Sequence, residues 1–405
     1  MRSVAFVVVA ACSFNPGRPG EVPDDDSGVP PIDAAPDPVC AATWTYAPSN
    51  FDPCAGVIIH PPLILTPGSY VFTPATGVLE KDGSAIMTLA TTDSSPRILS
   101  LEGLTVEGSA SLRIAGAEPL IIGVHGNATI SGRLDVSAQQ AQSGPGGGSC
   151  AGGTGGNGKA SPERWSAGGG GAGGAFGSIG ATGGTGDVEP TYPKTPGGPE
   201  MAAEGESMLV PLRGGCRGGA GGEEDPSCTS QGTPGVGGGA GGAIQVSVRN
   251  TFALAEGAQI AANGGGGRMG VNGTYGGGSH VGVGGGGGGS GGAILLEGAT
   301  VTIAGNAFLC ANGGGGGGGT HNNDGAIQDG AEGGCAVAAA AGGNGETGDG
   351  GPGGFRDANP GPGVAGTRQD DGGGGGGGGV GRIRVRDVSG ALTLAFGASP
   401  TPVID

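Results

Sequence analysis

Long uninterrupted glycine runs constrain the fold of this chain more than any other feature. The longest are Gly284–Gly289, Gly313–Gly319 and Gly372–Gly379, and glycine makes up 103 of the 405 residues. Glycine loses more conformational freedom on folding than any other residue. Such runs therefore either remain solvated loops or form a repeated structure that offsets this cost. The ordered alternative is a bundle of left-handed helices with three residues per turn, because only glycine lets backbones pack so closely.

Short apolar segments alternate with the glycine runs and repeat along the chain. Gly241–Gly264 and Gly291–Gly313 begin fifty residues apart and share a Gly-Gly-Ala-Ile start, an aliphatic stretch and an Ala-Asn-Gly end. A third copy runs from Gly381 to Phe396, and Ala128–Ala138 matches the second half of the unit. A repeated unit with insertions at one fixed point is typical of a solenoid.

Residues 97–138 hold the clearest strand pattern. Aliphatic segments of three to five residues follow one another there, separated by glycine corners such as Gly103, Gly116 and Gly132. These segments are too short and too closely spaced for helices. We therefore predict an all-β fold, a right-handed parallel β-helix (solenoid) with long glycine-rich loop insertions stacked on one side.

The composition changes divide the chain into six parts. The predicted parts are a signal peptide (1–11), a Pro/Asp-rich tether (12–40), an N-terminal β cap (41–95), the first β-helix rungs (96–140), glycine-rich insertions alternating with β rungs (141–381), and the last rung with a C-terminal cap (382–405).

The N-terminus has the layout of a secretory signal. Arg2 precedes a short apolar run, and Val9-Ala-Ala-Cys12 resembles the bacterial lipobox. The resemblance implies cleavage before Cys12 and acylation of its thiol, whereas plain secretion is the alternative. We predict an exported lipoprotein of the cell envelope, held by a lipid anchor at the outer surface or the outer membrane.

The eight cysteines fit an exported protein, because disulfides persist in oxidising compartments. Proximity in sequence favours Cys40–Cys54 and Cys216–Cys228, and Cys310–Cys335 would bracket a glycine run. If Cys12 is acylated, Cys150 is left without a partner. No pair has the C-x-x-C spacing of zinc or redox motifs, so no metal site is predicted.

The charge pattern excludes one class of partner and suggests another. A net charge of −17 leaves no basic footprint for nucleic acid. No cofactor is predicted, although acidic loops could bind calcium weakly. Arg382, Arg384 and Arg386 alternate with apolar residues and share one face, which either keeps the strand soluble or forms a stripe for an anionic ligand. No catalytic residues are predicted.

Two parts of the sequence resemble known protein families. Gly168–Gly186 resembles the PGRS glycine-rich repeats of surface-exposed bacterial proteins, and the segments of 97–138 resemble the pectate-lyase-like right-handed β-helix superfamily. We therefore predict a non-catalytic structural or adhesive lipoprotein of the cell surface that presents glycine-rich loops, with glycans or other surface proteins as partners. The alternative is a polysaccharide-active lyase or hydrolase.

Overall fold

The structure is a computed structural model, and its described residues form strands and extended segments but no helix. None of them forms a helix long and apolar enough to cross a membrane. The description excludes residues 1–43, 56–57, 149, 151–154, 161–165, 187–193, 225–231, 273–280, 322–326, 336–337, 369, 391, 395–398 and 402–405.

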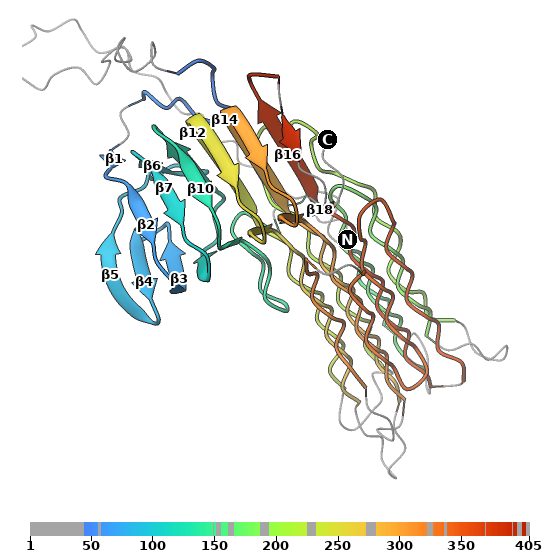
Figure 1. The fold of residues 1–405 in the computed structure, drawn as a ribbon. Coiled ribbons are helices and arrows are strands. Elements are labelled where there is room, and N and C mark those ends of the chain that lie inside the picture. The colour runs from blue at the N-terminus through green and yellow to red at the C-terminus, as the bar shows by residue number, and fades with distance from the viewer. Residues whose placement is uncertain are drawn as a thin grey trace, which may run out of the picture.

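The strands form two mostly parallel sheets that face each other (Figure 1). Only the pairings of β3 with β4 and of β4 with β5 are antiparallel among the described strands. The first sheet contains β1 (Ile59–His60), β2 (Leu63–Leu65), β6 (Arg97–Leu101), β7 (Leu104–Val106), β9 (Leu120–Val124), β10 (Ala128–Ile130), β12 (Ala243–Leu254), β14 (Ala293–Ile303), β16 (Arg382–Asp387) and β17 (Thr393–Leu394). The second sheet contains β3 (Gly68–Thr73), β4 (Val78–Lys81), β5 (Ser84–Thr88), β8 (Ala110–Ile114), β11 (Arg133–Asp135), β13 (Gln259–Ala261), β15 (Phe308–Cys310) and β18 (Ser399–Thr401).

Aliphatic ladders between the sheets form the main core. Leu120 pairs with Ile244, which pairs with Ile294, and Ile294 pairs with Ile383 in the parallel register of the first sheet. All four side chains are fully buried. Equivalent positions of successive repeats thus stack on one another, as the internal repeat predicted, and their burial supplies the hydrophobic stabilisation of the sheets.

The predicted fold class, a closed right-handed parallel β-helix, is wrong. The strands belong to two mostly parallel sheets, and the layers do not close into a solenoid. Short parallel strands with glycine corners give the same sequence pattern whether or not the layers close, so the pattern does not distinguish the two folds. After β11, β13 and β15 the chain enters the glycine-rich segments 136–242, 262–292 and 311–381 before it returns as β12, β14 and β16.

The features predicted for the N-terminus fall outside the described residues. The signal peptide (1–11), the acylated Cys12 and the tether (12–40) all lie within residues 1–43. The described residues provide no support for the prediction of a lipoprotein with a signal peptide.

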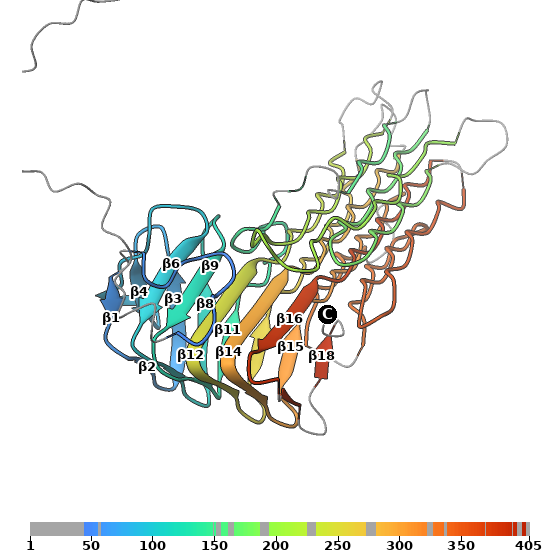
Figure 2. The same ribbon diagram turned by 90° about the horizontal axis from the view of Figure 1, so that it is seen from above.

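The described glycine-rich segments form an ordered bundle rather than solvated loops. In Figures 1 and 2 this glycine bundle extends away from one side of the two sheets. Three of its segments bond to one another in a cycle: Gly171 N–H donates to the Gly285 carbonyl at 2.9 Å, Gly285 to Gly373 at 2.9 Å, and Gly376 to Gly171 at 2.8 Å. Similar bonds recur three residues later in each segment, which is the period of a polyproline-II-type helix.

Glycine is required in the bundle because no room exists for a Cβ atom. A Cβ added to Gly285 would lie 2.1 Å from the Gly317 carbonyl oxygen, and one on Gly171 would lie 2.2 Å from that of Gly219. Neither residue has a φ in the left-handed region. The close approach of neighbouring backbones, rather than an unusual backbone angle, therefore excludes every other residue type.

Replacing Gly285 with alanine is expected to destabilise the bundle by about 1–3 kcal/mol, because the methyl group overlaps a backbone that cannot move aside. Gly108→Ala is the matched control, since a Cβ there meets nothing within 4 Å and its φ is not positive. The checks are the thermal midpoint and the hydrogen exchange of bundle amides. Equal thermal midpoints for the two variants would contradict the close packing of the backbones around Gly285.

Candidate functional site

A second, smaller core covers the outer face of the first sheet, the face turned away from the main core. Ile121, Ala243, Ala293 and Leu295 project from the strands and contact side chains of two crossing segments. One is the N-terminal arm, residues 44–54, and the other is the covering loop, residues 204–217. The segments contribute Phe51, Leu209, Leu212 and Cys216 to this second core.

A buried carboxylate fastens the N-terminal arm to the sheet. Glu297 of β14 is fully buried. The Ser49 N–H donates to its two oxygens at 3.0 and 3.3 Å, and the Ser49 hydroxyl donates at 2.8 Å. Ser247 Oγ donates at 2.8 Å, and Gln245 Nε2 lies 3.1 Å away. These donors satisfy a charge that would otherwise be costly to bury. We call Ser49, Gln245, Ser247 and Glu297 the buried polar network.

Asn50 links the network to the covering loop. Its side-chain amide donates to Gln245 Oε1 and to the Leu209 carbonyl, each at 2.9 Å, and its Oδ1 accepts from the Leu212 N–H at 3.1 Å. Arm, sheet and loop therefore meet at one hydrogen-bonded point. Because these bonds join residues about 160 to 250 positions apart, they fix tertiary rather than local structure.

Tyr46 adds an aromatic anchor beside the network. Its hydroxyl donates to the Val248 carbonyl at 3.0 Å, and the Arg386 guanidinium lies 5.5 Å from the centre of its ring. Burial, followed by the nearby charge of Glu297, raises the pKa of Tyr46 well above its ordinary range. The hydroxyl thus remains a hydrogen-bond donor at any physiological pH.

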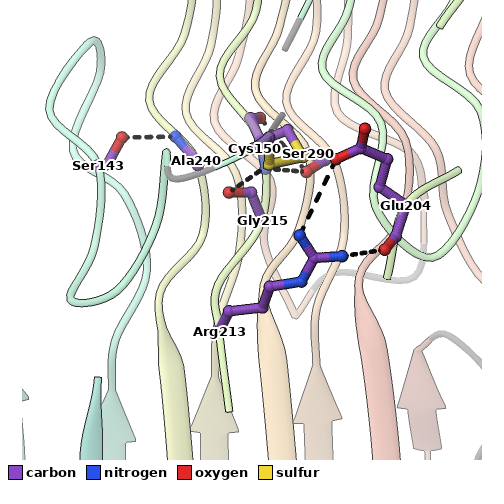
Figure 3. Close-up of a disulfide and its surroundings, with 8 residues drawn as sticks. Ser143, Cys150, Glu204, Arg213, Gly215, Ala240 and Ser290 are labelled. Atoms are coloured by element: carbon purple, nitrogen blue, oxygen red, sulfur yellow. Dashed lines mark hydrogen bonds and ion pairs between the residues drawn. A yellow bond between two sulfur atoms is a disulfide. The ribbon is translucent and has the colours of Figure 1, made fainter. Parts of the chain in front are cut away.

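A disulfide joins the base of the glycine bundle to the covering loop (Figure 3). Cys150 is bonded to Cys216, and the Cys216 N–H donates to Ser290 Oγ at 2.8 Å. Beside the disulfide, the Arg213 guanidinium contacts the Glu204 carbonyl and lies 3.9 Å from the Glu204 carboxylate. The outer face is therefore closed by a covalent link as well as by the polar network.

The disulfide also decides the chemistry of a three-residue cluster. The ligand atoms of Cys150, Cys216 and Glu204 lie within 4.8 Å of one another. Thiolates are the form in which cysteines bind metals, and the sulfurs here are joined to each other. The donor set of the oxidised protein does not fit a metal ion, and we assign none.

The cysteine pairings differ partly from those predicted. Cys310 is bonded to Cys335, the pairing that the sequence favoured. The pairing of Cys216 with Cys228 is wrong, because Cys216 is bonded to Cys150, whose chain segment lies beside it at the base of the bundle. Cys54 is also disulfide-bonded. Cys40 and Cys228 lie outside the described residues.

The three arginines of β16 share the outer face, but other parts of the chain contact each of them. Arg382 Nε donates to the Gly205 carbonyl at 2.8 Å, and Arg384 contacts the sulfur of Met208. Arg386 donates to the Ala47 carbonyl at 2.9 Å and lies 3.3 Å from Glu297. The structure therefore places them against the arm and the covering loop rather than in an open cationic stripe.

The carboxylate of Asp135, in β11, also has partners within the chain. Asp135 lies 3.3 Å from Arg113 and 3.0 Å from Arg133, and accepts from the Ser137 N–H at 2.9 Å. In the glycine bundle, His321 Nδ1 lies 3.0 Å from the buried carboxylate of Asp371, which also accepts from the Thr367 N–H at 2.9 Å. These contacts are the ordinary satisfaction of buried charge.

His125 gives the arm a pH dependence. Its ring lies edge-on to Trp44, with centroids 5.5 Å apart. Burial, followed by the positive charge of Arg249, lowers the pKa of His125. The folded state therefore binds fewer protons than the unfolded state, so the contribution is complete above about pH 6.5 and is lost as pH falls towards the lowered folded value.

His125→Gln is expected to reduce the loss of unfolding free energy that occurs as the pH falls from about 7 to about 5, because the variant has no imidazole to protonate. Urea unfolding at both pH values measures the effect, and His60→Gln is the control because the His60 side chain is bonded at the exposed Ala90 carbonyl. An unchanged pH dependence in His125→Gln would contradict the assignment.

Comparison of the chain with protein-family models, with curated proteins and with solved structures finds no match.

Proposed function

We propose that this protein is a non-catalytic structural or adhesive component of the cell exterior, in which the two-sheet body carries the glycine bundle as a stiff projection. The cycle of hydrogen bonds among Gly171, Gly285 and Gly373 carries the proposal. A bundle in which every segment bonds to its neighbours resists bending, whereas a solvated glycine chain does not. Such a rod is suited to holding a surface away from the body.

Two further observations support this reading. The disulfides Cys150–Cys216 and Cys310–Cys335 suit an oxidising compartment outside the cytosol. The buried carboxylates Glu297 and Asp135 are held by donors and arginines of the same chain. Carboxylates held in this way stabilise the packing of the chain. We propose glycans or other surface proteins as the adhesive partners.

A binding assay on the full chain tests the proposal. Purified protein is exposed to a panel of bacterial and plant polysaccharides, with and without calcium, and both retention and newly formed chain ends are measured. We expect retention without new ends. Gly285→Ala should lose retention, and Gly108→Ala should keep it, because only the first disturbs the bundle. New chain ends would overturn the proposal in favour of a polysaccharide-active enzyme.

A further inference from the structure

The N-terminal arm encloses a small pocket that the proposed function does not use. The pocket has a volume of about 380 Å³, and its lining is mostly apolar. Three aromatic rings and one carboxylate stand among its walls. The lining residues are Trp44, Tyr46, Ala47, Pro48, Phe51, Asp52, Pro53 and Cys54.

Three aromatic side chains contribute to the lining of the pocket. The Trp44 and Tyr46 rings have centroids 5.6 Å apart and planes inclined by 70°. Phe51, which also packs against the second core, supplies a third aromatic wall. Asp52 is exposed at the pocket, and one of its oxygens accepts from the Cys54 N–H at 2.9 Å.

The walls are held in place before any ligand arrives. The Tyr46 hydroxyl is bonded to Val248, and Ser49 and Asn50, between Tyr46 and Phe51, are bonded to Glu297 and Gln245. A site whose walls are already ordered loses less entropy on binding. The Tyr46 ring also contacts a cation of the chain itself, because the Arg386 guanidinium lies 5.5 Å from its centre.

The chemistry of the lining selects an organic cation. Aromatic faces attract cations, and cages of Trp, Tyr and Phe are suited to quaternary ammonium groups, which donate no hydrogen bonds. Asp52 supplies an opposite charge, and the chain carries a net charge of −17. A sugar would need several convergent hydrogen-bonding groups, whereas the Tyr46 hydroxyl is committed to Val248.

The indole nitrogen of Trp44 adds a polar requirement. Trp44 is only 8% exposed. Its Nε1 is buried and has no hydrogen-bond partner among the described residues. Because Trp44 lines the pocket, a ligand that brings an acceptor oxygen is the kind that would satisfy this donor. We infer that the pocket binds a trimethylammonium group joined to an oxygen-bearing chain, the chemistry of choline and of choline headgroups. This inference does not depend on the proposed function.

The full chain in a Trp165→Phe background, which leaves Trp44 as the fluorescent residue, is titrated with choline and with its neutral carbon isostere. In the isostere a tert-butyl group replaces the trimethylammonium group. We expect choline to bind about tenfold more tightly, which corresponds to a cation–π contribution of about 1.4 kcal/mol. Equal binding of the two compounds, or binding of neither, would overturn the inference.

Two variants test the walls. Asp52→Asn keeps an acceptor for the Cys54 N–H but removes the charge, and should weaken choline binding about threefold, whereas Asp357→Asn at another exposed site should not. Phe51→Leu keeps an apolar side chain and should weaken it at least about threefold. Unchanged affinity in both would refute the cage. Sedimentation with phosphatidylcholine vesicles then separates a lipid headgroup from free choline as the source of the ligand.

Discussion

Replacing Glu297 with alanine is expected to lower the free energy of unfolding by about 3–5 kcal/mol. The carboxylate is fully buried and accepts from Ser49 and Ser247, with Gln245 Nε2 and Arg386 within 3.3 Å. Its removal leaves buried donors without an acceptor, and each such donor costs about 1–3 kcal/mol. The N-terminal arm should then detach from the outer face of the first sheet.

Urea unfolding followed by Trp44 fluorescence in the Trp165→Phe background measures this loss, because Trp44 belongs to the arm. Glu256→Ala is the matched control, since Glu256 is exposed and accepts only a 3.3 Å bond from Asn306 among the described contacts. Glu297→Gln should fall between the two, because the amide keeps the shape and one acceptor. A Glu297→Ala protein as stable as the control would show that the network does not hold the arm.

Removal of the Cys150–Cys216 disulfide, in the double variant Cys150→Ser and Cys216→Ser, is expected to cost about 4 kcal/mol. The disulfide closes a loop with a sequence separation of 66 residues, and the entropy lost by the unfolded chain grows with loop length. The loop includes the bundle segment of Gly171, so the variant should also expose bundle amides to exchange.

The second disulfide provides an internal comparison. Cys310–Cys335 closes a loop with a sequence separation of only 25 residues, so its removal should cost about 3.5 kcal/mol, less than that of Cys150–Cys216. Chemical unfolding of both double variants measures the difference, and hydrogen exchange shows where protection is lost. A larger loss from the shorter loop would contradict the chain-entropy account.

The core of the fold could be predicted from sequence because its signal is local. The aliphatic segments within 97–138 are the strands β6 to β11, and the repeated Gly-Gly-Ala-Ile starts place Ile244 and Ile294 opposite each other in the first sheet. Alternation within a strand and identity between repeats are both visible in a single chain.

The connections could not be predicted, because glycine runs carry no side-chain pattern. Nothing in Gly372–Gly379 indicates that this segment bonds to Gly168, Gly171 and Gly174. For the same reason, the sequence does not indicate which cysteines form disulfides with one another. Cys216 lies twelve residues from Cys228 in sequence, yet folding of the bundle brings it to Cys150.

The buried polar network on the outer face of the first sheet could not be predicted for a related reason. Gln245, Ser247 and Glu297 interrupt otherwise apolar strands, which is a signal that sequence reading could have used, because polar residues facing a covered surface need partners. Their partner Ser49 lies about 250 residues away in the chain, and no periodicity points to it. The N-terminal arm lies within residues 41–95, for which the sequence predicted only an N-terminal β cap.

The period of three in the bundle restricts how such a protein changes length. Loss of one residue from a glycine segment turns every later residue by a third of a turn, which redirects the Val380 side chain that follows Gly372–Gly379. Loss of three residues restores every orientation and shortens the segment by about 9 Å. Since each segment bonds to neighbours in a cycle, matched changes in several segments preserve the register. The rod can thus grow or shrink through evolution only in triplets, shared among segments that are far apart in the chain.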